Sequence, residues 1–216
     1  MAIAPLKREE LLPGEGIILR KNANAVIDLR EAGLSRFAFD DLMWLVGMQG
    51  KEAIGGRIYL TNYRLVFKSH RFNRVRGTFS VFLPSIEEVR DASFAVTRQV
   101  AISTGMQDST FVVWGIPHLI EAIEECRAEF DPAYTVELAA LVLAEPWKIG
   151  GGLQAVARYE ALNRVLSAAR RRGDDFTGAA TAVTGSIDGR CNRVDAAGAL
   201  HVAELLIRAG QRPTIQ

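Results

Sequence analysis

The residue types that most often carry catalysis or bind metals are few in this chain and stand far apart. The three histidines, His70, His118 and His201, fall in three separate predicted elements, without the short spacing of paired metal ligands. The two cysteines, Cys126 and Cys191, are also too distant for a metal-binding pair or a disulfide framework, and Cys126 is predicted to be a buried free thiol. These residues therefore predict no metal site and no cofactor.

Two further patterns would suit phosphate binding or acid–base catalysis, but each lacks a necessary part. The segment 177–186, TGAATAVTGS, has the glycines of a phosphate loop but no lysine. The carboxylate pairs Asp40-Asp41 and Glu87-Glu88 fall in predicted turns, where solvated acids are the norm. No G-x-S-x-G or Rossmann motif occurs. The sequence predicts a protein that is not an enzyme, so its chemistry is expected to be that of binding.

A cluster of basic side chains is the first candidate for binding. Lys68, Arg71, Arg74 and Arg76 lie, together with His70, within nine positions. Near an anionic membrane each basic residue contributes about 1 kcal/mol, so four give roughly 4 kcal/mol, which corresponds to a millimolar affinity. The cluster is either a solvated loop or one part of a lipid-binding surface. In the second case it also needs a headgroup pocket, an inserted wedge or a multimer.

An apolar run between residues 37 and 48 is the second candidate. Gly47 interrupts it, and its centre is Met43, Trp44 and Leu45. The simplest interpretation is a strand or one-turn helix that belongs to the core. The alternative is an exposed hydrophobic wedge of these three residues, which would enter a bilayer or a groove on a partner.

The segment 55–68, GGRIYLTNYRLVFK, indicates most clearly which elements position these candidates. Ile58 and Leu60 before a corner, and Leu65 and Phe67 after it, follow the period-two pattern of a sheet with one buried face. The corner itself, Thr61-Asn62, suits a sharp turn because asparagine tolerates left-handed backbone. The residues that alternate with the buried ones are Arg57, Tyr59, Arg64, Val66 and Lys68.

The wording G-x-ϕ-Y-L-T-N-x-R-L-V-F of this segment resembles the signature of GRAM domains, which have a pleckstrin-homology-like (PH-like) fold. The resemblance implies an α+β domain over residues 10–130: a β-barrel of about seven antiparallel strands capped by a C-terminal helix. Domains of that family dock on membranes or on other proteins. Because the first hairpin of such folds usually faces the ligand, the resemblance also makes Arg20 and Lys21 candidates for anionic-lipid binding.

The remaining elements of this predicted domain follow from local patterns. Residues 15–29 are interpreted as two strands around a polar turn, RKNAN. A helix is predicted to start at Pro117 and to end near Phe130, with an apolar face formed by residues three and four positions apart. The other predicted strands are 78–83, 94–96, 100–103 and 110–114, with a turn around 105–109.

Residues 131–216 are predicted to be a helical extension, with helices at 134–145, 153–172 and 194–209. The last of these has an apolar stripe, and such a stripe must be covered by the barrel or by a second copy of the chain. We expect a homodimer, because closed twofold dimers are the commonest oligomers. The stripe consists of Val202, Leu205, Leu206 and Ala209.

Composition narrows the class of partner. The net charge is +1, so bulk electrostatics give no reason to expect nucleic acid. No apolar run has the roughly 20 residues of a membrane span, and the N-terminus lacks the pattern of a secretion signal. Arginine outnumbers lysine 21 to 5, as in proteins of GC-rich bacterial genomes. The sequence predicts a cytoplasmic binding module or adaptor that acts through protein contacts or self-association. The alternative is peripheral binding of anionic lipid on the inner face of the membrane.

Overall fold

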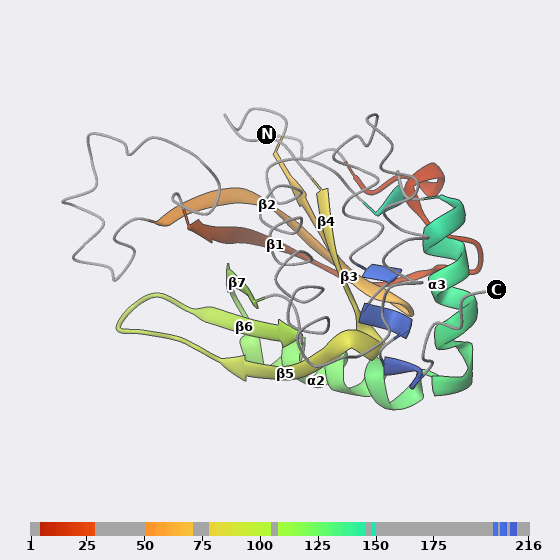
Figure 1. Cartoon of the computed structure of the whole chain (residues 1–216). Helices are drawn as coiled ribbons and strands as arrows, with labels where there is room; N and C mark the ends of the chain where they lie inside the picture. The colour runs from red at the N-terminus through yellow and green to blue at the C-terminus, as the bar shows by residue number, and fades with distance from the viewer. Residues whose placement is uncertain are drawn as a thin grey trace, which may run out of the picture.

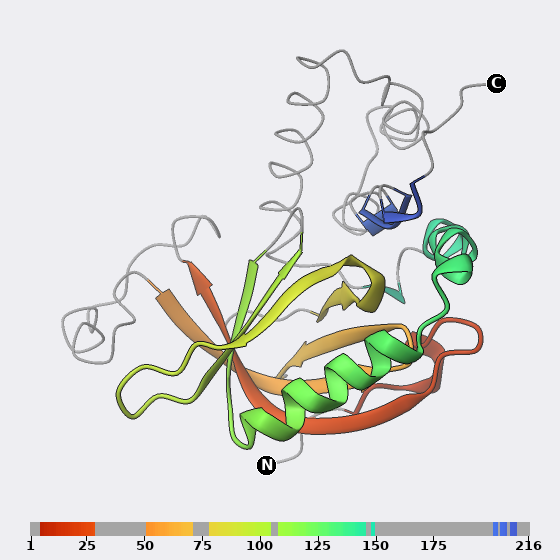
Figure 2. The same cartoon turned by 90° about the horizontal axis from the view of Figure 1, so that it is seen from below.

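The structure is a computed structural model that describes residues 5–28, 51–70, 78–104, 108–145, 148–149, 201–202, 204–206 and 208–210. Within these residues seven strands form one antiparallel sheet in the order β4-β3-β2-β1-β7-β6-β5. The sheet curls strongly, and α2 runs across it (Figures 1 and 2). The architecture is α+β and PH-like, as predicted. The strands are β1 (Ile17–Asp28), β2 (Lys51–Thr61), β3 (Arg64–Ser69), β4 (Thr78–Phe82), β5 (Ile86–Asp91), β6 (Gln99–Thr104) and β7 (Asp108–Val113).

The first strand corrects the prediction of two strands around a polar turn. β1 is one continuous strand that pairs with β2 over its whole length and with β7 through residues 23–26. Ala23 and Ala25 are buried, whereas Asn22 and Asn24 are exposed. The polar stretch is therefore the outer face of a strand, and the alternation of asparagine and alanine carries its period.

The second half of the sheet contains three further corrections. Residues 94–96, predicted as a strand, lie in the turn of the β5–β6 hairpin, where Phe94 pairs only with Thr97. The acidic stretch after Pro84, predicted as a turn, is β5. β7 already begins at Asp108, inside the predicted turn. A three-residue apolar run holds too few positions to show a period, so it does not separate a strand from a turn.

The helix α2 (Ile116–Glu129) closes the main core, as predicted. Pro117 stands in its first turn, and Leu119 and Ile123 are fully buried. These residues share one cluster with the inner faces of the strands, including Leu65 and Phe67, so the predicted register of β2 and β3 is confirmed. The Phe67 ring lies 5.8 Å from that of Phe111 on β7.

The outer face of β2 and β3 is buried too, contrary to the prediction of one buried face. Tyr59 and Val66 lie beneath Leu6 and Leu11 of the N-terminal arm, which we define as residues 5–16. The arm contains a short 3₁₀ helix, η1 (Arg8–Glu10). It gives the hairpin a second apolar layer that the pattern within the hairpin does not reveal.

A third apolar cluster lies beside the barrel. The helix α3 (Thr135–Ala144), predicted as 134–145, buries Leu138 and Val142 against Phe82 at the end of β4. Helical residues near the C-terminus join this cluster, since Val202 and Leu205 are buried in it. The described part of the predicted C-terminal stripe is therefore covered by the chain's own barrel and α3. Figure 2 shows the C-terminal helical turns beside α3.

Candidate functional site

A buried ion pair lies at the corner between β2 and β3. Arg64 and Glu15 have no exposed side-chain surface, and they meet through Nε–Oε1 at 2.7 Å and Nη2–Oε2 at 2.9 Å. The guanidinium also donates to the Ser80 hydroxyl and to the carbonyls of Lys148 and Glu10. All five N–H groups of arginine thus have an acceptor. This explains how a charge can be fully buried here.

The other polar residues of the GRAM-like segment serve the same corner. The Thr61 hydroxyl donates to Glu15 and accepts from the backbone N–H of Arg64. The Asn62 side chain accepts from Gly16 N–H and donates to the Gly14 carbonyl, which fixes the arm to the turn. These polar residues therefore hold the fold together and do not form an open binding site.

Gly56, the second residue of this segment, is required by close packing. A Cβ there would stand 2.4 Å from the Lys68 carbonyl oxygen and 2.5 Å from Cζ of Phe67. No side chain fits at those distances, so glycine lets the core ring of Phe67 lie against β2. The resemblance to GRAM domains is thus carried by residues with structural roles.

The N-terminal arm binds the ammonium group of Lys68, one of the predicted lipid-binding residues. Its Nζ lies 2.7 and 2.5 Å from the two carboxylate oxygens of Glu10 and also donates to the Pro5 carbonyl. Lys68 and Glu10 are both partly buried. With its charge neutralised in this way, Lys68 offers little to an anionic headgroup while the arm is in place.

Lys21, the second predicted residue that the structure describes, is also engaged within the chain. Its Nζ donates to the carbonyls of Trp114 and Gly115 at 3.1 and 3.2 Å, just before α2 begins. Its neighbour Arg20 is exposed on β1. Of the three lipid candidates within the described ranges, only Arg20 therefore presents its charge to solvent without a hydrogen bond to a described residue.

The other predicted site residues lie outside the described residues. These comprise the rest of the basic cluster and the hydrophobic wedge, and both remain predictions. They are Arg71, Arg74, Arg76, Met43, Trp44 and Leu45.

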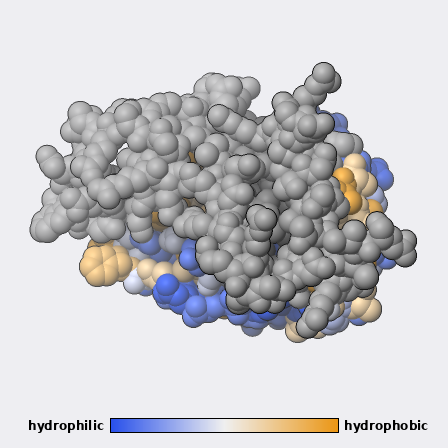
Figure 3. Space-filling view, in the orientation of Figure 1, coloured by the Kyte–Doolittle hydropathy of each residue, from blue (hydrophilic) through white to orange (hydrophobic). Residues whose placement is uncertain are grey.

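The structure instead exposes a different apolar surface, at the β5–β6 hairpin. Phe94 is 63% exposed and Val96 84% at the turn, and Trp114 is 79% exposed at the end of β7. Trp114 belongs to this end of the sheet because the neighbouring Val113 N–H donates to the Arg98 carbonyl. We call these three residues the hairpin-tip surface. In Figure 3 hydrophobic atoms stand out at the edge where this hairpin extends in Figure 1.

The sequence patterns do not reveal this surface, because they predict all three residues in strands. Phe94 and Val96 fall in the predicted strand 94–96, and Trp114 falls at the end of the predicted strand 110–114. No local pattern distinguishes an exposed apolar turn from a buried one. The position of residues 94–96 between two segments long enough to pair as a hairpin, β5 and β6, is the feature that could have indicated a turn.

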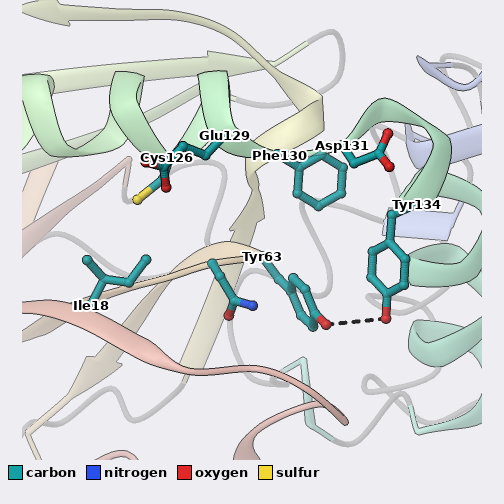
Figure 4. Close-up of a pocket in the computed structure, with 8 residues that line it drawn as sticks. Ile18, Tyr63, Cys126, Glu129, Phe130, Asp131 and Tyr134 are labelled. Carbon is teal, nitrogen blue, oxygen red and sulfur yellow. Dashed lines mark hydrogen bonds between the residues drawn. The ribbon is translucent and has the colours of Figure 1, made fainter.

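A cleft opens on another side of the barrel, between the start of β1 and the C-terminal end of α2. It has a volume of about 280 Å³. Figure 4 shows the Tyr63 and Tyr134 rings meeting through their hydroxyls, with Phe130 above them and Ile18 across the opening. Its lining residues are Ile18, Asn62, Tyr63, Cys126, Glu129, Phe130, Asp131 and Tyr134. We call it the aromatic cleft.

Two ionisable side chains that line the aromatic cleft have raised pKa values. Burial raises the pKa of the Cys126 thiol, and the charges of Glu129 and Glu125 raise it further. The hydrogen bond with Tyr63, followed by burial, raises the pKa of the Tyr134 hydroxyl, and the charge of Glu137 adds to this. The neighbouring carboxylates thus raise the pKa values of both Cys126 and Tyr134. Cys126 itself is a buried free thiol, as predicted.

The described residues also bear on metal sites and on membrane spans. No group of three histidine, cysteine or acidic side chains in these ranges could hold a metal ion. None of the helices that the structure describes is long and apolar enough to cross a membrane.

Near the C-terminus His201 and Glu204 are buried 3.6 Å apart, and the Thr104 hydroxyl donates to Glu204. This pair is enclosed by the fold and belongs to neither exposed surface.

Comparison with known proteins assigns the chain to no family. No family model matches the chain, and no curated protein has a significantly similar sequence. Among solved structures, the C-terminal domain of an unknown protein from Leishmania infantum matches with a TM-score of 0.37 and 13% identity, over 54% of this chain and 88% of that one. The Vps36 N-terminal PH domain matches with a TM-score of 0.36 and 15% identity, over 55% of this chain and 83% of that one. At such scores the likenesses add nothing to what the strand order already shows.

Proposed function

We propose that this chain is a non-catalytic binding module or adaptor that acts through protein contacts in the cytoplasm. The observation that carries the proposal is the hairpin-tip surface. Phe94, Val96 and Trp114 expose most of their side chains, although burial of each would stabilise the fold by roughly 1.5–3 kcal/mol. Clustered exposed aromatic residues are typical of interaction sites, and aromatic side chains dominate the binding energy of protein interfaces.

The backbone of the turn supports this proposal. Ala95, between the two exposed residues, has a φ of 50°, a left-handed conformation that residues other than glycine rarely adopt. Phe94 and Thr97 exchange both of their backbone hydrogen bonds around it. The turn is therefore short and closed. A rigid turn presents its two apolar side chains with little ordering cost on binding.

Local charges favour a protein over an anionic membrane as the partner. Beside the turn, Arg90 and Arg98 are balanced by Glu88 and Asp91. Hydrogen bonds from Ser93 hold the pKa of Asp91 below its usual value, so that this carboxylate stays charged. With a balanced tip, the attraction of roughly 1 kcal/mol per basic residue to an anionic leaflet largely cancels.

Site-specific photo-crosslinking tests the proposal. A photoreactive phenylalanine analogue is placed at position 94 in the full chain, and at position 121 on the outer face of α2 as the control. A protein that crosslinks only from position 94 is purified, and its affinity for the unmodified chain is measured by calorimetry. The double variant Phe94→Ser/Val96→Ser should bind it at least tenfold more weakly. Equal affinity of this variant would contradict the proposal.

A vesicle assay separates the alternative function. The full chain is sedimented with vesicles of phosphatidylcholine and phosphatidylserine. The proposal expects it to remain in the supernatant. Sedimentation that the double variant loses would show that the hairpin-tip surface enters membranes. If the double variant still sediments, the membrane contact lies elsewhere, and the predicted basic residues Arg71, Arg74 and Arg76 become the candidates for it.

A further inference from the structure

The aromatic cleft has a feature that folding alone does not explain. In the pairing of β1 with β2, Ile17 is opposite Thr61 and Leu19 opposite Leu60, so Ile18 is an extra residue in a β-bulge. Such bulges re-aim side chains and are common beside binding sites. Here Ile18 lies at the cleft, and Ile17 and Ile18 are 42% and 54% exposed.

The wall of the cleft opposite the bulge is aromatic. The ring centroids of Tyr63 and Tyr134 are 5.5 Å apart, and those of Phe130 and Tyr134 are 6.3 Å apart at an angle of 62°. Phe130 and Tyr134 are only partly buried, so their rings keep surface toward the opening. Ring faces carry negative charge density, which attracts ammonium and guanidinium groups.

The charged residues that line the cleft are Glu129 and Asp131, and both are exposed. Asp131 accepts a hydrogen bond from Ala133 N–H and turns away from the rings in Figure 4. Glu129 makes no ion pair with any residue that the structure describes. Arg127, the nearest base on α2, instead contacts Glu124 and the Ile86 carbonyl. The charge of the cleft is therefore negative.

We infer that the aromatic cleft is a second docking site, for a basic segment of a partner protein. An arginine or lysine side chain would lay its aliphatic stem on Ile18 and its charged head against the Phe130 ring, on the side that faces Glu129 (Figure 4). Long basic side chains are amphipathic in this way. The occupant follows from charge complementarity. The described rim of the cleft carries acids and no base, and beside an apolar wall it matches a basic group on an apolar stem.

The inference concerns binding but does not depend on the hairpin-tip surface, which lies elsewhere on the barrel. The probe is a fluorescein-labelled hexapeptide, Gly-Leu-Arg-Leu-Arg-Gly. The matched probe replaces each arginine by citrulline, which has nearly the same shape but no charge. Fluorescence anisotropy with the full chain should give a clearly weaker affinity for the citrulline peptide. No binding of the arginine peptide would overturn the inference, as would equal binding of both.

Three variants of the full chain locate the binding. Glu129→Gln should weaken binding of the arginine peptide about two- to fivefold, the range of an exposed ion pair. Glu121→Gln removes the same charge from the exposed side of the same helix and should have no effect. Phe130→Leu keeps an apolar side chain but removes the ring, and should weaken binding roughly two- to fivefold. The Phe130→Leu result counts only if the melting temperature of that variant matches that of the wild type. If the two differ, the Glu129→Gln variant alone tests the location of binding.

The outcomes separate this inference from the proposed function. If Glu121→Gln weakens binding as much as Glu129→Gln, the peptide follows the general charge of α2 and the inference is wrong. The double variant Phe94→Ser/Val96→Ser should bind the peptide as the wild type does. Loss of peptide binding in that variant would mean that the peptide occupies the hairpin-tip surface, which contradicts the cleft but supports the proposed function.

Discussion

At the scale of single residues, Arg64 shows how a local pattern can identify a segment and still mislead about one side chain. Alternation in β3 predicts that Arg64 faces away from the core. It does so, yet it is fully buried, because Glu15 and the arm cover that face. Glu15 precedes Arg64 by 49 positions, so no local pattern joins them. Leu65 and Phe67, whose strand partners are near in sequence, were predicted correctly.

Removing one partner of the buried pair should be costly. We expect Glu15→Gln to lower the free energy of unfolding by about 3–5 kcal/mol, because the Arg64 charge is then buried without its counter-charge. The control is Glu9→Gln, which breaks the solvent-exposed pair with Lys7 and should leave the free energy of unfolding nearly unchanged. Urea denaturation measures both. Equal changes in the two variants would show that the buried pair is not a main support of the fold.

The thiol of Cys126 should titrate above its usual range. Burial and neighbouring carboxylates raise its pKa from the ordinary 9.0, so the folded state favours the protonated thiol. The stability that this preference contributes is present below pH 9 and is lost as the pH rises through the pKa of the folded state. Rates of alkylation by iodoacetamide, measured from about pH 7 to 11 on a Cys191→Ser chain, should rise at higher pH in the folded than in the urea-unfolded protein. Coincident profiles would contradict this.

At the scale of elements, the sequence was informative where the face that packs on the main core is regularly apolar. The inner faces of β2 and β3 and one face of α2 each showed such a period. β1 was divided in the prediction because its outer face is polar and its inner face has only small alanines at the centre. The burial of Tyr59 and Val66 depends on the N-terminal arm, and the arm's own sequence gives no strand or helix period that would indicate docking.

Deleting residues 1–11 should therefore destabilise the barrel although every strand remains. Tyr59 and Val66 would become exposed, and each buried side chain of this size contributes roughly 1.5–3 kcal/mol. Glu15, which the deletion leaves in place, should keep Arg64 neutralised. Thermal melting compares the shortened chain with a Leu6→Ala chain, which should lie between it and the wild type. An unchanged melting temperature would mean that the arm does not hold this face in solution.

At the scale of the whole molecule, the expected homodimer depends on which apolar faces the chain leaves uncovered. Val202 and Leu205 are covered internally. The outer face of α3 is not, since Val136, Ala140 and Leu143 are exposed at positions four and seven residues apart. These three residues form one face of the helix and would suit a twofold contact with a second copy.

Multi-angle light scattering tests the dimer. If α3 pairs with its copy, the full chain should have twice the 23.7 kDa mass of one chain, and Leu143→Asp should return it to the mass of one chain. Glu137→Gln, a change on the same helix that adds no charge, serves as the control. A single-chain mass for the wild type at all concentrations would rule out the dimer.

The sequence positions of the Arg64 acceptors also determine when the barrel can finish folding during synthesis. The Lys148 carbonyl follows Arg64 by 84 residues, and the Ile149 carbonyl completes the corner by accepting from Ser80. Ribosomes add about 5–20 residues per second, so roughly 4 to 17 seconds pass between the synthesis of Arg64 and that of its last acceptor. Once Val113 has been added, the nascent chain holds all seven strands, but the corner must stay hydrated until residue 148 follows. The barrel therefore completes its folding only after residue 149 has left the ribosome, and a shortened chain that stops at the end of α2 reproduces that unfinished stage.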